Sequence, residues 1–204
     1  MPRHGKQIKR IILGVTGTFG SGKTTVSKIF KKYHAEIIDA DKLAHACLKA
    51  GGTSYRKIVS LFGAGILRKD KSINRKRLAA VVFNNKSLLK KINSVIHPRV
   101  INQINKRIKK SKSSIIVLDA PLLIESGLHK VVDKIIVVTI TRKEQINRMT
   151  RKGSLKRSDI SKRVKAQIPL GLKKPMADFI IDNSGTVVNT KRQVGAIRRK
   201  LWKN

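Results

Sequence analysis

Eight residues near the start of the chain have the types and spacing that bind a nucleoside triphosphate. Gly17-Thr-Phe-Gly20-Ser-Gly22-Lys23-Thr24 fits the pattern G-x-x-x-x-G-K-[ST], with a strand-like apolar segment before it and a helical pattern after it. Glycines let backbone N–H groups turn inward around phosphate oxygens, and the N-terminus of the next helix favours the same anion. Lys23 can reach the β- and γ-phosphates, and the Thr24 hydroxyl can ligate Mg²⁺. The motif predicts nucleotide binding and leaves hydrolysis and phosphoryl transfer open.

Two aspartates are the next residues that could do chemistry. Asp39 and Asp41 follow the apolar segment 35–39, at the carboxyl end of a predicted strand, where open α/β sheets place ligands. A carboxylate near the γ-phosphate could accept a proton from an acceptor hydroxyl or organise magnesium, and we take Asp41 as the base. The alternative is that both are ordinary turn or helix-capping acids, which the spacing alone leaves open.

Three further positions carry weaker signals. Asp119 ends an apolar segment, where a phosphate-loop protein usually has its second acid, and Glu125 lies in the following loop. His97-Pro98 reads without further information as a helix end. Each has an ordinary structural explanation beside the functional one.

Basic residues in the stretch 143–165 could close over transferring phosphates. Arg148, Arg151 and Lys152 are the candidates, although in so basic a chain any single arginine is first explained as part of a solvated face.

A parallel α/β sheet would position these residues. Apolar, β-branched segments predict five strands, at 10–15, 35–39, 114–118, 134–139 and 178–182. A basic helix is expected at the C-terminus. Helical spacing is predicted for 22–33 and for most of 42–110, and 121–128 is expected to be a loop or short helix. Alternation of strands and helices predicts an α/β fold with a helical insertion between core strands.

Composition excludes several classes of protein. The 204 residues suit one compact α/β unit, and no apolar run reaches the roughly 18–20 residues that cross a membrane. The single cysteine excludes an intrachain disulfide and a cysteine-based zinc cluster. The N-terminal segment lacks the long apolar stretch of a secretory signal, so we expect a cytoplasmic protein with a short basic tail at 1–9.

The net charge of +36 is the most unusual property of the chain. Such a charge suggests polyanion binding, but the lysines and arginines are spread along the whole sequence rather than gathered in a tail. The aromatic content of 4% also argues against stacking on single-stranded nucleic acid. A general composition bias therefore explains the charge better, and a positive field can still aid capture of an anionic substrate.

The order of these pieces resembles the dephospho-CoA kinase family over about residues 10–195. Besides the glycine-rich loop, Leu118-Asp-Ala-Pro-Leu-Leu-Ile-Glu-Ser-Gly127 and Ala177-Asp-Phe-Ile-Ile-Asp-Asn-Ser-Gly185 are similar to highly specific signatures of that family. Further similar segments are Ile38–His45, Arg75–Phe83, Ile96–Pro98 and Ala166–Pro169. Seven of the 11 acidic residues lie at positions that match the family pattern, which favours composition bias over a nucleic-acid role.

The resemblance implies a P-loop NTPase-like parallel sheet flanked by helices. It implies a kinase core at 10–50, 111–142 and 171–204, a helical CoA-substrate insertion at 51–110 and a small helical lid at 143–170. The implied reaction is transfer of phosphate from ATP to the ribose 3′-hydroxyl of dephospho-CoA, giving CoA and ADP, with Mg²⁺. No membrane or nucleic-acid partner is expected.

The resemblance also assigns roles residue by residue. Asp41 is implied as the base, with Lys23 and Arg148 as charge stabilisers, and Thr24 as the metal ligand. The implied ATP-binding residues are Gly17, Thr18, Phe19, Gly20, Ser21, Gly22, Lys23, Thr24, Thr25, Arg148 and Asn183. The implied substrate-binding residues are Asp39, Asp41, His45, His97, Pro121, Leu122 and Glu125.

The chain departs from the family pattern in two places. Thr18 stands where the family usually has glycine, so we expect a negative φ there. Lys152-Gly153 stands where the family has an Arg-Asp pair, so the lid loses a bidentate guanidinium.

Two other functions remain as alternatives. The loop and the Asp-Ala-Asp segment also suit another small-molecule P-loop kinase, for a nucleoside or nucleotide. The charge alone suits a basic RNA-associated protein.

Overall fold

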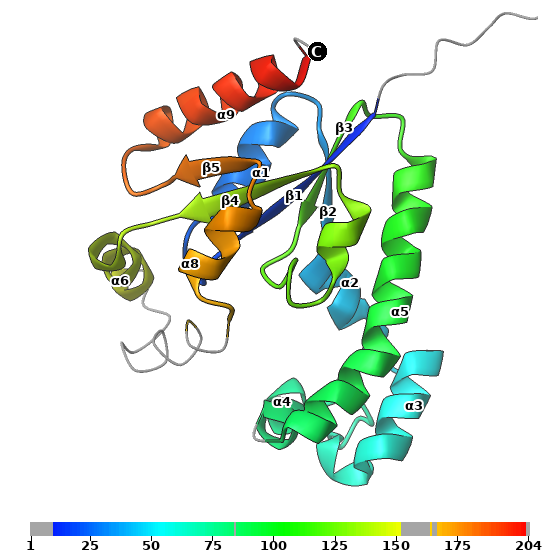
Figure 1. Ribbon diagram of the computed structural model, residues 1–204. Helices are drawn as coiled ribbons and strands as arrows, with labels where there is room; N and C mark the ends of the chain where they lie inside the picture. Colours follow the sequence, from blue (N-terminus) through cyan, green and yellow to red (C-terminus); the bar gives the residue numbers. More distant parts are fainter. Residues whose placement is uncertain (1–9, 84, 152–163, 165–166, 203–204) are drawn as a thin grey trace, which may run out of the picture. The chain divides into compact units, whose positions relative to one another are not determined.

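The computed structural model describes residues 10–83, 85–151, 164 and 167–202. The basic tail at 1–9, Lys152-Gly153 and half of the expected lid lie outside the described residues. The chain forms two compact units: one holds the described residues up to Ile38 and from Ser111 onward, and the other holds Asp39–Lys110. Figure 1 labels the elements of both. The second unit begins at Asp39, at the end of a strand.

The first unit is built on a five-stranded parallel sheet in the order β2-β3-β1-β4-β5. Its strands are β1 (Ile11–Gly17), β2 (Glu36–Asp39), β3 (Ile115–Asp119), β4 (Lys134–Thr139) and β5 (Phe179–Asp182). The register pairs Val15 of β1 with Asp119 of β3, and Gly17 with Val138 of β4. This order confirms the predicted α/β class.

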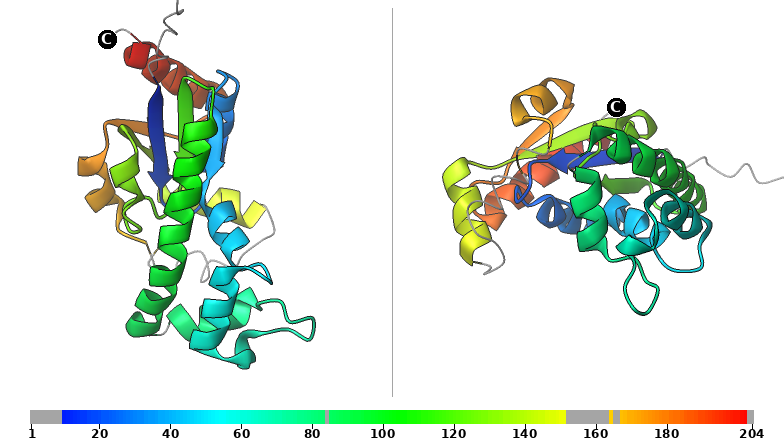
Figure 2. Two further views of the ribbon diagram at one scale, coloured as in Figure 1. Left: turned by 90° about the vertical axis from the view of Figure 1, so that its right-hand side faces the viewer. Right: turned by 90° about the horizontal axis from the view of Figure 1, so that it is seen from below.

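Helices cover both faces of this sheet. On one face, α1 (Lys23–Lys31) and α9 (Val187–Trp202) pack on the strands, while η2 (Leu128–Val131) and α8 (Leu170–Lys173) lie on the other (Figure 2). Phe30 of α1 and Val194 of α9 are fully buried against strand residues such as Val15. The remaining elements of this unit are α6 (Arg142–Arg151) and η3 (Lys174–Met176).

The second unit is helical. It contains α2 (Ala40–Cys47), α3 (Thr53–Phe62), η1 (Ala64–Ile66), α4 (Arg75–Phe83) and α5 (Lys86–Lys110). Its core joins apolar side chains of α3, α4 and α5, among them Ile58, Leu78 and Ile92. Residues 42–110 were expected to be mostly helical, and the described part of them is.

Two details differ from the sequence-based expectations. Strand β1 runs on to Gly17, because β4 pairs with it up to that residue, whereas its pairing with β3 ends at Val15. The interpretation of His97-Pro98 as a helix end is wrong: α5 continues through Pro98. Proline removes one helical hydrogen bond, but Ile92 before it and Val100 and Ile104 after it are buried, so packing on both sides holds the helix together.

Within the described residues, none of the helices has the length and apolarity needed to cross a lipid bilayer.

Candidate active site

The glycine-rich loop joins the end of β1 to the start of α1. Gly17 has φ +151°, and a Cβ there would collide with the Val138 carbonyl of β4. Gly22, with φ +87°, occupies the left-handed N-cap of α1, and a Cβ there would collide with the Asn183 amide. These two positions require glycine. Thr18 is not among the described residues with positive φ, which confirms the expected negative φ.

Lys23 lies across this loop rather than in solvent. The side chain is buried, and its ammonium donates hydrogen bonds to the carbonyls of Gly17 at 3.3 Å and Thr18 at 3.0 Å. The ammonium is therefore held inside the turn whose N–H groups would meet a phosphate. Thr24, the next residue, is exposed.

Ser21 carries an unusual hydroxyl. Its side chain is fully buried, and its Oγ has no hydrogen-bond partner among the described residues. Burying an unpaired hydroxyl costs free energy, so this oxygen is suited to a partner that arrives with a ligand.

Two glutamines that were not expected to belong to the site hold the tip of the loop. The backbone N–H of Phe19 donates to Oε1 of Gln167 at 2.7 Å, and the Phe19 carbonyl accepts a hydrogen bond from Nε2 of the buried Gln145. Gln145 comes from α6 and Gln167 from the segment before α8. Both lie within the expected lid, 143–170, near its two ends, so the described ends of that segment are bonded to the loop.

Asn183, an expected ATP-binding residue, lies against the loop. Its side-chain amide donates to the Ser21 carbonyl at 2.8 Å, and its Oδ1 accepts a hydrogen bond from the Thr190 hydroxyl at 2.8 Å. Its backbone N–H donates to the Thr139 carbonyl at 2.9 Å. Asn183 therefore joins the phosphate loop to the ends of β4 and β5.

Arg148 of α6 is half-buried beside the same corner. Its Nε donates to Glu144 at 2.7 Å, and its guanidinium also donates to the Gly185 carbonyl at 3.0 Å. The structure thus brings Arg148 to the turn that follows Asn183. Arg151, one turn further along α6, is exposed.

Asp119 stands at the end of β3, beside Val15 of β1. Its Oδ2 accepts a hydrogen bond from the hydroxyl of Ser27 in α1 at 3.0 Å. The carboxylate is therefore fixed close to the first turns of α1, the helix that presents Lys23 and Thr24. No signal in the sequence singled out Ser27.

Glu125 pairs with a lysine that no sequence pattern singled out. Lys173 of α8 has no exposed surface, and its ammonium contacts Glu125 Oε1 at 2.8 Å and the Pro121 carbonyl at 3.2 Å. The same Oε1 accepts the backbone N–H of Ile168 at 3.1 Å. Glu125 Oε2 is buried without a partner among the described residues. Leu122, in the same loop, is exposed.

Asp39 and Asp41 belong to the helical unit. Asp39 is the N-cap of α2, where its Oδ1 accepts the backbone N–H of Lys42 at 2.9 Å and its Oδ2 faces the Lys42 ammonium at 3.5 Å. The helix-capping alternative therefore describes what Asp39 does. Asp41 lies in the first turn of α2, and His45 follows one turn later; both are exposed.

His97 is half-buried in α5, in the same unit. Burial lowers the pKa of its imidazole below the ordinary value of 6.5, because the charged form is poorly solvated there. The side chain therefore favours the neutral form at neutral pH.

Comparison with known proteins identifies relatives of this chain. The sequence profile described as "Dephospho-CoA kinase" matches residues 11–189. A dephospho-CoA kinase from Carboxydothermus hydrogenoformans is 41% identical over 195 residues, which cover 94% of each chain.

Two solved structures are similar to the whole fold. A crystal structure from Thermus thermophilus has a TM-score of 0.84 and 26% identity, covering 94% of this chain and 98% of the other. A dephospho-CoA kinase from Campylobacter jejuni has a TM-score of 0.68 and 28% identity, covering 94% and 97%. Similarity thus extends along both units of the chain.

Proposed function

The chain belongs to the dephospho-CoA kinase family and has that kinase activity in coenzyme A biosynthesis, and on that premise we propose how its own residues carry the reaction. The observation that carries the proposal is the buried Lys23 ammonium, held within the glycine-rich loop at the N-terminus of α1. A fixed cation and a helix N-terminus in one turn are suited to the β- and γ-phosphates of ATP.

Charge stabilisation falls to Lys23 and Arg148. On ATP binding, the Lys23 ammonium exchanges the carbonyls of Gly17 and Thr18 for phosphate oxygens. Arg148 exchanges its bond to the Gly185 carbonyl in the same way. Both cations then neutralise the charge that spreads over the transferred phosphoryl group, which is where most of the catalysis of this transfer lies.

Asp41 is the proton acceptor. The 3′-oxygen of the acceptor ribose forms a bond to the γ-phosphorus while the bond from that phosphorus to the ADP oxygen breaks. The hydroxyl proton passes to the Asp41 carboxylate, and ADP leaves with the electron pair of the broken bond. Asp41 suits this role because its side chain is exposed in the first turn of α2, and Asp39 caps the same helix.

Thr24 and Asp119 would hold Mg²⁺. Their oxygens are hard donors of the kind that Mg²⁺ prefers, the Thr24 hydroxyl is exposed, and Ser27 fixes the Asp119 carboxylate near the same helix. When bound, the ion neutralises negative charge on the phosphates.

The helical unit Asp39–Lys110 binds the acceptor, and the segment 143–170 closes over the nucleotide to exclude water. The Gln145 and Gln167 contacts to Phe19 support this role of the segment, since they couple both of its ends to the loop. We expect the high positive charge of the chain to serve no nucleic-acid partner. Tight RNA binding in a salt titration, together with an absence of kinase activity, would refute the assignment of the chain as a kinase without a nucleic-acid partner.

An acceptor panel tests the function. ADP release is measured with ATP and dephospho-CoA, and compared with nucleosides and pantetheine compounds as acceptors. We expect rapid release with dephospho-CoA alone. Faster release with a nucleoside would favour the other small-molecule kinase.

Asp41→Asn tests the base. We expect kcat to fall by about 10²-fold, the loss typical of removing a general base, while ATP still binds. Asp39→Asn is the matched control: it keeps a hydrogen-bond acceptor at the N-cap of α2 and should leave kcat within a fewfold of the wild type. An unchanged kcat in Asp41→Asn would remove Asp41 from this role.

A further inference from the structure

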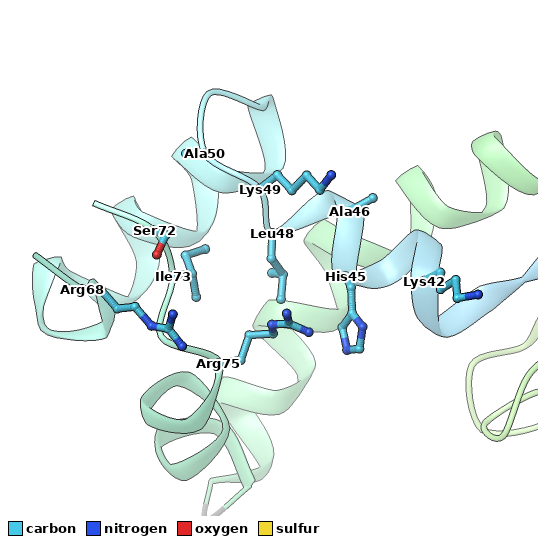
Figure 3. A pocket seen from close by; sticks show the side chains of 10 residues that line it. All are labelled: Lys42, His45, Ala46, Leu48, Lys49, Ala50, Arg68, Ser72, Ile73 and Arg75. Carbon is cyan, nitrogen blue, oxygen red and sulfur yellow. The ribbon is translucent and has the colours of Figure 1, made fainter. Parts of the chain in front are cut away.

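A pocket of about 440 Å³ lies wholly within the helical unit. Its walls come from the end of α2, the turn after that helix, and the segment 68–75, which begins beside the Leu67–Ile73 bridge. Figure 3 shows Leu48 and Ile73 between basic side chains that approach from these segments. The volume falls in the range of ligand sites, about 300–1,000 Å³.

The polar lining of the pocket is cationic. Its charged residues are Lys42, Lys49, Arg68 and Arg75, and His45 stands beside them. Lys42 is already paired with Asp39. The side chains of Lys49 and Arg75 have no hydrogen bond or ion pair within the described part of the chain. A pocket with this lining favours an anion.

The Asp70 carboxylate, whose pKa is lowered by its hydrogen bonds to Ser72 and in part by the charge of Arg68, is already engaged. Asp70 feels the charge of Arg68, but its Oδ1 accepts hydrogen bonds from the Ser72 hydroxyl at 2.6 Å and from the Ser72 backbone N–H at 3.0 Å. These hydrogen bonds lower the pKa of Asp70 and keep its carboxylate on its own turn. The guanidinium of Arg68 can therefore bind a ligand in the pocket that it lines.

The position of the pocket along α2, one turn after Asp41, indicates which anionic group would bind in it. Asp41 and His45 are four residues apart in this helix, so they lie on one face about 5–6 Å apart. His45 lines the pocket. A ribose whose 3′-hydroxyl meets Asp41 can therefore place its 5′-substituent at the pocket, one helical turn away.

We propose that this pocket is the subsite for the 5′-diphosphate of dephospho-CoA. Arg68 and Arg75 bind the phosphate oxygens through paired N–H groups, and Leu48 and Ile73 provide apolar contact for the organic chain beyond the diphosphate. The assignment rests on the proposed function, because the ligand is the acceptor named there. It adds Arg68 and Arg75 to the residues that recognise that acceptor.

Binding of dephospho-CoA without ATP tests the subsite. Calorimetric titration compares the wild type with Arg75→Ala and Arg68→Ala, and with the controls Lys76→Ala and Lys69→Ala, which remove exposed neighbouring charges outside the pocket. We expect Kd to rise about tenfold or more for each arginine variant, as for loss of a charge-assisted hydrogen bond, and less than twofold for the controls. Equal effects in arginine variants and controls would overturn the proposal.

Adenosine and inorganic pyrophosphate separate the parts of the ligand. Adenosine has the ribose but no diphosphate, so its Kd should be the same in the wild type and in both arginine variants. Pyrophosphate should compete with dephospho-CoA in the wild type, and the competition should weaken in the variants. A loss of adenosine binding as large as the loss of dephospho-CoA binding would overturn the proposal. Arg68 lies in an exposed turn, so its variant keeps the fold even if Arg75→Ala does not.

The subsite and the function can fail separately. If the wild type binds dephospho-CoA through these arginines but transfers no phosphate to it, the function fails and the subsite stands. If the wild type turns over and the arginine variants bind dephospho-CoA as the controls do, the subsite fails and the function stands.

Discussion

Three cations of the sheet unit are bonded within that unit, whereas the side chains of two cations that line the pocket of the helical unit are not bonded to any described residue. In the sheet unit, Lys23, Arg148 and Lys173 are each bonded to carbonyls or carboxylates of the same unit. In the helical unit, Lys49 and Arg75 line a pocket without such bonds among the described residues. The phosphate loop is thus held in shape before ATP arrives, whereas the pocket leaves its charges for the acceptor. The fixed cations of the sheet unit suit catalysis by groups that are in place before the reaction, whereas the cations of the pocket suit attraction of an anionic substrate.

Lys23→Met tests the catalytic side of this comparison and should have the largest effect. Loss of the ammonium removes the charge that stabilises the transferred phosphoryl group, so kcat should fall by about 10²–10³-fold in an ADP-release assay. Lys28→Met, at an exposed position of the same helix, should keep wild-type turnover. A Lys23→Met enzyme with normal kcat would contradict the role of the loop.

Lys173→Met tests whether the internal bonds of the sheet unit stabilise it. The variant leaves Glu125 buried without its cation, so the free energy of unfolding should fall by about 3–5 kcal/mol in urea titrations. Adding Glu125→Gln should recover part of this loss, because the uncompensated charge is removed. Lys191→Met on the exposed face of α9 is the control. Equal stabilities of Lys173→Met and this control would refute the prediction.

Asn183→Ala tests the link between the loop and the ends of β4 and β5. It deletes the bond to the Ser21 carbonyl and leaves the Thr190 hydroxyl only the Thr186 carbonyl, at 3.2 Å, as acceptor, so we expect a loss of about 1–3 kcal/mol in unfolding free energy. The KM for ATP should rise several-fold, since the loop loses a support. Asn189→Ala, at a half-buried position of α9 whose side chain accepts a hydrogen bond from Arg192, should change neither quantity much.

His97→Asn tests the helical unit and should have the smallest effect. Burial lowers the pKa of His97 below 6.5, so the unfolded chain binds more protons than the folded one near and below that pH. Stability contributed by the neutral imidazole is complete above 6.5 and is lost as pH falls. Between pH of about 7.5 and about 5.5, the urea midpoint should therefore fall more in the wild type than in His97→Asn. Equal falls would contradict this.

Local patterns were enough to predict the sheet and the phosphate loop. The loop motif is contiguous in the sequence, and short runs of apolar, β-branched residues predict buried parallel strands. Lys23, Thr24 and Asp119 could therefore be selected from the sequence. Asp39 and Asp41 were selected too, but only the helix cap distinguishes them.

The residues that could not be predicted act across long sequence distances. Lys173 meets Glu125 and Gln145 meets Phe19 only because the fold returns those segments to one place. A buried lysine and a buried glutamine look like surface residues in a chain that contains 47 Lys and Arg residues. Pro98 was misread for a related reason: burial on both sides of it, which the local pattern does not contain, keeps α5 continuous.

The most direct test of the central claim is the position of the phosphate in the product. Wild-type enzyme is incubated with ATP and dephospho-CoA, and the product is examined by phosphorus NMR and mass spectrometry. The account predicts one new phosphate monoester on the ribose 3′-oxygen for each ADP released. ADP release without a new phosphate ester, or a phosphate on another hydroxyl, would contradict it.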